Sequence, residues 1–314
     1  MKFWGKAYKK ISTGHRLMLL IVIKSDGSSP GKAGFKMMVD DSGEIWGSIG
    51  GGTMEYRLVE QSRKLLEDNN QSIILQKQDH HPNAENNSGM ICSGVQWIAF
   101  YPLNQNHLNL ISDILSIINK KKTNIIKYDN SGISILESTK SFNHSKPLIK
   151  EDNWDYQEQP GIKNTLYIFG AGHVSLALSK MAKELDFDVM LFDNRKSINT
   201  FDENTFADKK KVIHYSEAAK HVPEGANIYV AIMTFAHQSD TIVLKQMIGK
   251  KVKYLGMMGS ELKVQSVFEQ LKSDGYIEEE LSTINSPIGL SINSITPQEI
   301  AVSIMAMIIK VKNS

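Results

Sequence analysis

The sequence Tyr167-Ile168-Phe169-Gly170-Ala171-Gly172-His173-Val174 indicates how the second half of this chain folds. A short apolar run enters two glycines and continues into an amphipathic segment, which is the order of a strand, a tight turn and a helix. Gly170 permits the tight turn, and Gly172 lets the backbone approach a phosphate at the unpaired amides of the helix that starts near His173. The stretch therefore predicts a nucleotide-binding turn.

The segment after this turn adds a second feature of the same kind of site. Asp193 ends the next apolar run, 21 residues after Gly172, where a carboxylate reaches a ribose hydroxyl. Ser175 occupies the place of a third glycine, and Arg195 is a candidate for holding a phosphate. We predict a Rossmann-like domain that binds NAD(P) or another nucleotide. The alternative is a sheet whose glycines serve packing only, with Arg195 in solvent.

The rest of the second half alternates short apolar runs with amphipathic stretches. This alternation predicts a parallel sheet with covered faces. The expected elements are strands at 166–169, 189–192, 228–233 and 252–255 and a helix at 174–185. A last helix over 300–311 is predicted to follow a capping box, in which Thr296 caps an orphan amide and Glu299 reaches back.

Two further turns follow strands at the same expected edge of the sheet. His237 and Asp240 come soon after one apolar run, and Gly259 and Ser260 follow the next in a second strand-glycine-helix arrangement. Ligands bind at the carboxyl ends of strands in open α/β sheets, so we predict these residues as cofactor-binding. In the alternative interpretation they only begin helices.

The first half opens with an apolar run over 17–23, which predicts a buried strand. Residues 35–39 and 44–46 flank a turn and predict a hairpin. Apolar and charged positions from Met54 predict an amphipathic helix that ends near 69–70. We expect an N-terminal α/β domain with a mixed sheet.

A triple glycine precedes that helix. The amides of Gly50, Gly51 and Gly52 can face an anion, and Glu55 stands in the first helical turn. We predict these four residues as cofactor-binding. A tight strand-to-helix connection, in which the helix dipole favours Glu55, is the alternative.

The only cysteine, Cys92, lies in a polar, turn-rich stretch before an apolar run. A structural zinc site is excluded because no second cysteine and no histidine stand at ligand spacing. Cys92 is either a small buried hydrophobic side chain or a functional thiolate that acts as sulfur acceptor or metal ligand. His80 and His81 are adjacent, a poor arrangement for one metal, and we predict that both are exposed.

Composition limits the classes of function. In 314 residues, 36 basic and 34 acidic side chains give a net charge of +2, too small for a protein whose main partner is nucleic acid. A single cysteine excludes an internal disulfide framework, and no apolar run approaches membrane-spanning length. We expect a cytoplasmic protein with no membrane segment.

The domain boundary is expected where periodicity is lost. Between residues 138 and 165 the chain gathers Ser, Asn, Lys, Asp and Gln with two prolines. We predict an N-terminal domain over 1–145, a linker over 146–162 and a Rossmann-like domain over 163–314.

Six ordered segments resemble the xanthine dehydrogenase accessory factor family (XdhC/CoxI). They are Gly-Ser-Ile-Gly-Gly-Gly-x-x-Glu (47–55), Cys-x-Gly (92–94), Phe-Gly-Ala-Gly-His-Val (169–174), Thr-x-x-His-x-x-Asp (234–240), Gly-Met-x-Gly-Ser-x-x-Lys (256–263), and Ser-Pro-Ile-Gly-Leu (286–290) with Thr-Pro-x-Glu-Ile-Ala-Val-Ser-Ile (296–304). The resemblance extends from about residue 15 to the C-terminus.

The resemblance implies an N-terminal domain that binds the molybdenum cofactor (molybdopterin) and a C-terminal Rossmann domain. It also implies a homodimer that receives sulfur from a cysteine desulfurase and delivers sulfurated cofactor to a molybdenum hydroxylase client. Cys92 is then the catalytic residue, as sulfur relay or molybdenum ligand, and Glu55 accepts hydrogen bonds from the pterin ring. A cofactor-binding chaperone is expected rather than a turnover enzyme.

Several positions depart from the family pattern. They are Gly31 for an arginine, Ser93 for a glycine, Glu261 and Leu262 for a basic pair, Ser291 for an aspartate and Met307 for an acidic residue. The lost arginines weaken a phosphate clamp, because no side chain at those positions supplies a guanidinium fork.

Two other functions compete with the maturation factor. Gly170, Gly172 and Asp193 suggest an NAD(P)-binding oxidoreductase with His237 as acid or base, although nothing marks a substrate pocket. The departures at Glu261 and elsewhere favour a non-enzymatic scaffold whose nucleotide site regulates docking. Measuring bound pterin and molybdenum in the purified protein would discriminate among the maturation factor, the oxidoreductase and the scaffold.

Overall fold

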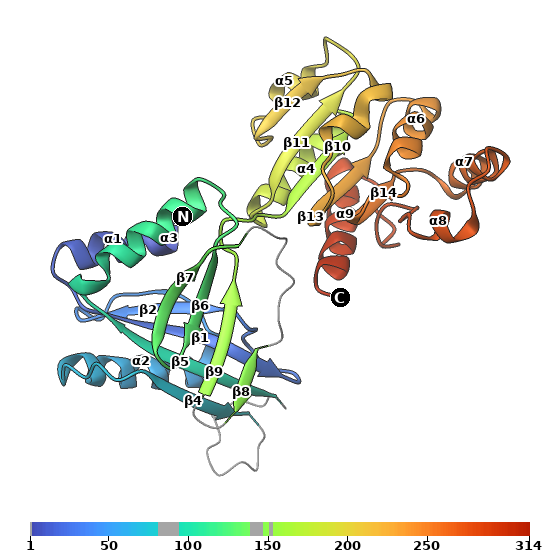
Figure 1. Cartoon of the computed structure of the whole chain (residues 1–314). Helices are drawn as coiled ribbons and strands as arrows, with labels where there is room; N and C mark the ends of the chain where they lie inside the picture. Colours follow the sequence, from blue (N-terminus) through green and yellow to red (C-terminus); the bar gives the residue numbers. More distant parts are fainter. Residues whose placement is uncertain (1, 81–93, 139–146, 151–152) are drawn as a thin grey trace. The chain divides into compact units, whose positions relative to one another are not determined.

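The computed structural model describes residues 2–80, 94–138, 147–150 and 153–314 (Figure 1). The chain divides into two units, unit 1 over residues 1–162 and unit 2 over 163–314. Within the described residues, no helix is long and apolar enough to cross a membrane.

Unit 1 is built on a five-stranded sheet of order β3-β2-β1-β5-β4. The strands are β1 (Leu17–Asp26), β2 (Lys36–Asp40), β3 (Ile45–Gly47), β4 (Ile74–Asp79) and β5 (Val95–Leu103). The predicted hairpin is confirmed as β2 and β3, and the described pairings within this sheet are antiparallel. Residues 17–23 of the central strand β1 are fully buried, which explains their unbroken apolar run.

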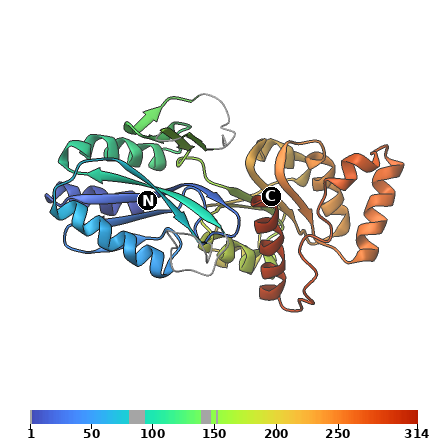
Figure 2. The same ribbon diagram turned by 90° about the horizontal axis from the view of Figure 1, so that it is seen from below.

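Helices cover both faces of this sheet. The predicted amphipathic helix is confirmed as α2 (Gly52–Glu67), and it packs with Met18 and Leu20 of β1. Leu19 and Ile21 point to the opposite face and pack with α1 (Lys2–Ser12) and α3 (Leu108–Asn119), which follows the short η1 (Gln105–His107). Figure 2 shows α2 and α3 on opposite sides of the strands.

A second sheet of unit 1 has the order β7-β6-β9-β8. Its strands are β6 (Ile125–Asp129), β7 (Gly132–Leu136), β8 (Leu148–Lys150) and β9 (Asn153–Glu158). The expectation of a linker over 146–162 is therefore wrong, because β8 and β9 lie within it. Trp154 and Tyr156 alternate with polar residues and are buried in the core, and Trp154 Nε1 donates to the Tyr101 hydroxyl at 2.9 Å.

Unit 2 contains a parallel five-stranded sheet of order β12-β11-β10-β13-β14. The strands are β10 (Thr165–Phe169), β11 (Asp188–Asp193), β12 (Lys209–Val212), β13 (Gly225–Ile232) and β14 (Val252–Met257). This confirms the predicted α/β class and Rossmann-like sheet. The edge strand β12 escaped prediction because its Lys-Lys-Lys-Val sequence is exposed and carries no apolar alternation.

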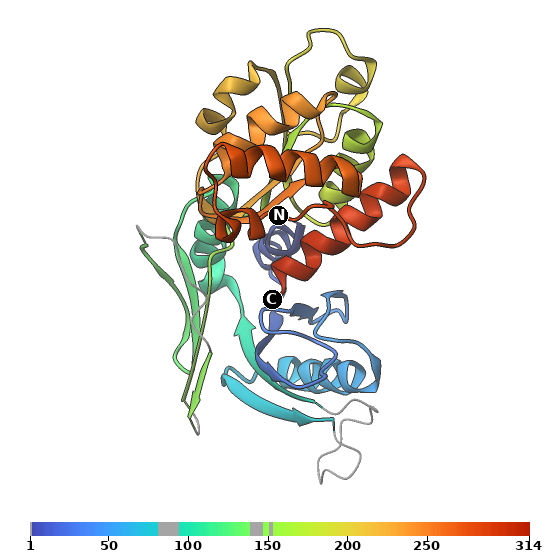
Figure 3. The ribbon, with the colours of Figure 1, turned by 90° about the vertical axis from the view of Figure 1, so that its right-hand side faces the viewer.

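Helices also cover both faces of the unit 2 sheet. One face carries α4 (His173–Glu184) and α9 (Pro297–Lys312), which pack along each other (Figure 3). The other carries η2 (Tyr215–His221), α6 (His237–Met247) and α7 (Glu261–Ser273), while α5 (Asn199–Glu203) and α8 (Glu278–Ser282) are single turns. Because β10 and β13 are neighbours whose following helices lie on opposite faces, their carboxyl ends mark the switch point where open α/β sheets bind ligands.

The capping box at the start of α9 is confirmed. Thr296 Oγ1 accepts from the Glu299 amide at 3.3 Å, and Glu299 Oε2 accepts from the Thr296 amide at 2.9 Å. The backbone amides of Thr296 and Ile295, which both donate to Glu299 Oε2, lower the pKa of Glu299. The helix that completes the unit 2 core is therefore fixed at its first turn by local chemistry.

Candidate functional site

The glycine turn after β10 has the geometry of a close backbone approach. Gly170 has a φ of 103°, and a β-carbon there would lie 2.1 Å from the backbone oxygen of Met233. Gly172 caps the N-terminus of α4, and a β-carbon at this position would meet no atom within 4 Å. The turn therefore needs glycine at 170 for packing and leaves open space at 172, where a ligand phosphate would approach.

Ser175, in place of a third glycine, is buried and closes the turn. Its hydroxyl donates to the backbone oxygen of Gly170 in a short hydrogen bond. A serine in place of the third glycine therefore leaves the strand-turn-helix geometry intact.

Asp193 lies at the carboxyl end of β11 with its side chain fully buried. Oδ1 accepts from the backbone amide and Nε of Arg195, both at 2.9 Å. Oδ2 accepts from the Ala171 amide at 2.8 Å and from Arg195 Nη2 at 2.9 Å. Burial alone would raise the pKa of Asp193, but the hydrogen bonds from Arg195 and Ala171 hold it below its usual value.

The Arg195 guanidinium also lies over an aromatic ring. Its central carbon is 5.2 Å from the centroid of Phe235, whose side chain is 81% exposed. Phe235 stands between β13 and α6, so the pair joins the ends of β11 and β13. Sequence reasoning missed Phe235, although an aromatic residue inside a polar turn is an available signal.

Asp240 and Lys263 are brought together across two turns. Lys263 Nζ is 2.5 Å from Asp240 Oδ2, while Oδ1 accepts from the amide and the hydroxyl of Thr234 at 2.8 and 2.7 Å. Asp240 is fully buried, which places it at the predicted edge as a structural anchor. The other site residue predicted on this turn, His237, is exposed at the start of α6.

Ser260 caps α7 by accepting from the Lys263 amide, as a helix-start residue does, and the neighbouring Gly259 is half-buried. His173 is exposed and lines a groove of about 610 Å³ with residues that include Leu176, Lys180 and Phe206. His173, Gly259 and Ser260 each follow the carboxyl end of a strand, as expected from the order of strands and turns. Their roles in cofactor binding stay predictions.

The triple glycine of unit 1 is organised by Glu55. Oε2 of Glu55 accepts from the amides of Ile49 and Gly51, each at 3.0 Å, and from the Ser48 hydroxyl at 2.8 Å. The three glycines adopt positive φ, and a β-carbon at Gly51 would meet no atom within 4 Å. The amides of Ile49 and Gly51 thus already donate to a carboxylate of the protein itself. The Gly51 amide is one of those that we expected to face an anion.

A buried glutamine supports this loop from below. Gln96 Nε2 donates to the backbone oxygens of Gly31 and Ile49 at 3.2 and 3.1 Å, and Oε1 lies 2.8 Å from His80 Nε2. The expectation that His80 is exposed is therefore wrong, because Gln96 gives the buried ring a polar partner. Sequence reasoning missed Gln96, although a single amide inside the apolar run 95–103 is a recognisable signal.

Gly31 also explains a departure from the family pattern. A β-carbon at this position would lie 2.1 Å from the backbone oxygen of Ile49, so a larger residue requires another path for the loop. Cys92 and His81 lie outside the described residues, and their roles remain predictions. The flanking residues are fixed, because the His80 amide donates to the Gly94 backbone oxygen at 3.0 Å.

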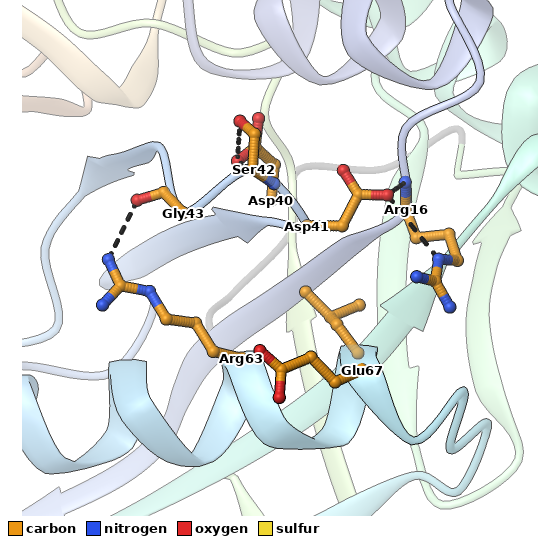
Figure 4. A pocket seen from close by; sticks show the side chains of 8 residues that line it. Arg16, Asp40, Asp41, Ser42, Gly43, Arg63 and Glu67 are labelled. Carbon is orange, nitrogen blue, oxygen red and sulfur yellow. Dashed lines mark hydrogen bonds and ion pairs between the residues drawn. The ribbon is translucent and has the colours of Figure 1, made fainter.

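A separate cavity of about 310 Å³ opens in unit 1 (Figure 4). It is lined by Arg16, Asp40, Asp41, Ser42, Gly43, Arg63, Leu66 and Glu67. Its polar groups bind one another: Asp41 accepts from the Arg16 amide at 3.0 Å, and Arg63 donates to the Gly43 backbone oxygen at 3.0 Å. The cavity contains none of the residues predicted for a site.

Two family models match the chain. Residues 11–76 match the XdhC and CoxI family, and residues 166–308 match the XdhC Rossmann domain. Together the matches cover more than half of the 314 residues. The chain belongs to the XdhC and CoxI family. The resemblance inferred from its motifs is confirmed.

Named relatives of this XdhC-family chain differ in length. Uncharacterized protein YqeB of Escherichia coli is 25% identical over 300 residues, 93% of this chain, but the chain spans only 43% of that relative. A Bacillus subtilis protein, named as a probable xanthine dehydrogenase component, is 22% identical over 314 residues, with 94% of this chain and 93% of that protein covered.

A crystal structure described as a xanthine dehydrogenase from Bacillus halodurans has a TM-score of 0.73 to this chain. The match covers 98% of this chain and 95% of that one at 22% identity. At this identity the comparison establishes the shared fold of the XdhC-family chain.

The structure locates the departures from the family pattern in unit 2. Glu261 and Leu262 are exposed in the first turn of α7, where Leu262 is 80% exposed, and Ser291 is exposed as well. Met307, which is part of α9, is half-buried and packs against the core that α9 and α4 cover. A basic pair in this first turn would have faced solvent, so its loss removes charge without disturbing the core.

Metal-ligating side chains do not cluster in the described parts of the two units. Among these residues, no three His, Cys, Asp or Glu side chains are grouped as a metal site. The Asp and Glu side chains of the two sites described above instead form hydrogen bonds and ion pairs within the protein.

Proposed function

We propose that this chain is an accessory factor for a molybdenum hydroxylase of the xanthine dehydrogenase type, which binds the molybdenum cofactor in unit 1 and aids its sulfuration and insertion. Membership of the XdhC and CoxI family supports an accessory role. The observation that carries the proposal is the match to the Bacillus subtilis relative, which is named for xanthine dehydrogenase and aligns over nearly the full length of both chains.

The loop at Gly50–Gly52 fits a planar ring better than a phosphate. The amides of Ile49 and Gly51 already donate to Glu55, which removes donors that a phosphate would need. Glu55 instead supplies a carboxylate acceptor, and a β-carbon at Gly51 would meet no neighbouring atom. Glu55 is therefore assigned to the N–H edge of the pterin ring, with Gly51 leaving room for close approach.

When bound, the cofactor supplies the metal centre that the client hydroxylase uses. The residues of this chain would bind and orient it. Gln96 donates hydrogen bonds to the backbone oxygens of Gly31 and Ile49, and His80 is hydrogen-bonded to Gln96. The loop is therefore positioned before any ligand arrives.

Cys92 is proposed to receive the sulfur. A thiolate attacks the terminal sulfur of a cysteine desulfurase persulfide, a new S–S bond forms on Cys92, and the desulfurase leaves as a thiolate. The described flanks of this segment, His80 and Gly94, border the Gly31 loop. The proposal also includes a molybdenum hydroxylase client, a homodimer and a cytoplasmic location, as the family resemblance implies.

Purification after co-expression with the molybdenum cofactor pathway tests this function. Bound pterin is measured by fluorescence after oxidation, and molybdenum is measured by elemental analysis of the same sample. We expect near-equimolar pterin in the wild type, a large loss in Glu55→Gln, and no loss in Glu60→Gln, which lies on the same helix outside the loop. Absence of pterin from the folded wild-type protein would overturn the proposal.

A further inference from the structure

We propose that the carboxyl edge of the unit 2 sheet binds an adenine dinucleotide whose ribose carries a 2′-phosphate, and that Arg195 selects this ligand. The site is formed by the ends of β10, β11 and β13 (Figure 1). This inference concerns unit 2 alone and does not depend on the function proposed for unit 1.

Asp193 has no remaining capacity to accept a ribose hydroxyl. An ionised carboxylate offers about four acceptor positions. Arg195 fills three of them through its amide, Nε and Nη2, and the Ala171 amide fills the fourth. The carboxylate is also fully buried. Asp193, which would recognise an unphosphorylated ribose, thus has all its acceptor positions occupied by hydrogen bonds within the protein.

Arg195, unlike Asp193, still has polar atoms that are available to a ligand. Nε and Nη2 face the carboxylate, while Nη1 forms no hydrogen bond to the described residues, and the side chain is 37% exposed. A free guanidinium edge prefers a phosphate to a hydroxyl because charge-assisted hydrogen bonds are the stronger ones. The Asp193 contacts and the Phe235 ring beneath the guanidinium hold this edge in one orientation.

The local charge favours an anion. Arg195 neutralises Asp193, and the next residue, Lys196, is exposed on the same turn. A 2′-phosphate would therefore meet a net positive turn. The pyrophosphate of the same ligand would lie against Gly172 and the N-terminus of the 12-residue helix α4.

A buried hydroxyl provides an independent indication of a ligand. Tyr215 is 5% exposed, and its O–H proton has no acceptor among the described residues, while the Asn194 backbone amide lies close to its oxygen. Burial and the nearby carboxylates of Asp193 and Asp240 raise the pKa of Tyr215 more than the Asn194 amide and Arg195 lower it, so the hydroxyl is a neutral donor near these carboxylates. Buried polar groups are nearly always paired, and a bound ligand or its ordered water would satisfy this one.

Isothermal titration calorimetry of the full chain with NADP+ and NAD+ tests the inference. We expect the wild type to bind NADP+ at least about ten-fold more tightly than NAD+. Arg195→Ala should lose this preference and gain NAD+ affinity, because Asp193 becomes available to the ribose. Arg195→Lys should keep the sign of the preference at reduced size.

Lys312→Ala is the matched control, because Lys312 also lies over an aromatic ring, that of Phe187, which precedes the amino end of β11. It should bind both ligands like the wild type. Equal or tighter binding of NAD+ by the wild type, or binding of neither ligand, would overturn the inference. Failure of Arg195→Ala to fold would leave the wild-type comparison and Arg195→Lys as decisive measurements.

Discussion

Lys263 Nζ lies 2.5 Å from Oδ2 of the fully buried Asp240. The same nitrogen donates to the Met258 backbone oxygen at 3.1 Å, and Oδ1 of Asp240 is held by Thr234. This ion pair ties the turn after β14 to the turn after β13. These two turns at the carboxyl edge of the unit 2 sheet are therefore fixed relative to each other by residues 23 positions apart in the sequence.

Replacing Lys263 by methionine should destabilise unit 2, because the buried Asp240 carboxylate loses its counter-charge. We expect a loss of about 1–3 kcal/mol in the free energy of unfolding, measured by urea denaturation, since Lys263 is partly exposed and water can enter. Lys272→Met is the control on the same helix, because its pair with Glu278 is exposed and should contribute little. Equal effects of the two substitutions would contradict the buried-pair explanation.

Acid should weaken unit 2 through Asp193. Its folded-state pKa is below the usual value, so its contribution to stability is fully present above about pH 4 and is lost as the pH falls through the folded pKa. Asp193→Asn should remove this part of the acid dependence. Urea unfolding between pH 3 and pH 6 measures it, and parallel pH profiles for wild type and variant would show that Asp193 contributes nothing.

Replacing Gly51 by valine should reduce cofactor binding far more than stability. With φ of 81° and ψ of −169°, Gly51 occupies a conformation that β-carbons disfavour by about 1–3 kcal/mol, but the new side chain would meet no atom. It would instead fill the space that a ligand needs. Pterin content and melting temperature are measured on one preparation.

Gly249→Val is the control for backbone strain. Gly249 has a φ of 82° and equally open surroundings, but it lies in unit 2 outside the loop. It should lower the melting temperature without changing pterin content. Unchanged pterin in Gly51→Val with a collapse in stability would show that the loop is only a connection.

Replacing Gln96 by leucine should destabilise unit 1 by about 1–3 kcal/mol, because the buried carbonyls of Gly31 and Ile49 lose their donor. Chemical denaturation measures this loss, with Gln61→Leu on the partly exposed face of α2 as the control. Pterin content should fall as well, since the loop loses its support. Wild-type stability in the variant would remove Gln96 from this role.

Replacing Cys92 by alanine should leave folding nearly intact and abolish the ability to support a molybdenum hydroxylase. A small side chain contributes little core area, while no other residue of the chain can provide a thiolate as sulfur acceptor. Client activity in a strain that lacks the wild-type protein measures the effect, and circular dichroism checks the fold. Equal client activity with the variant would exclude Cys92 from the mechanism.

The elements that depend on local chemistry could be predicted from the amino-acid sequence. The glycine turn at Gly170, the helix start at Thr296 and the buried run 17–23 were all predictable. Each is encoded within a few residues, because turn geometry, capping and hydrophobic periodicity act between near neighbours. The order of the motifs also indicated the family.

Long-range contacts, visible only in the folded chain, show which polar groups are paired within the protein and which are available to a ligand. Asp193 stood where a ribose ligand is expected, but contacts with Ala171 and Arg195 saturate it. His80 looked exposed from its polar surroundings in the sequence, but it pairs with Gln96, 16 residues away. The pairings of Asp193 with Ala171 and of His80 with Gln96 leave no local pattern, because partners 22 and 16 residues apart meet only when strands and turns converge in the fold.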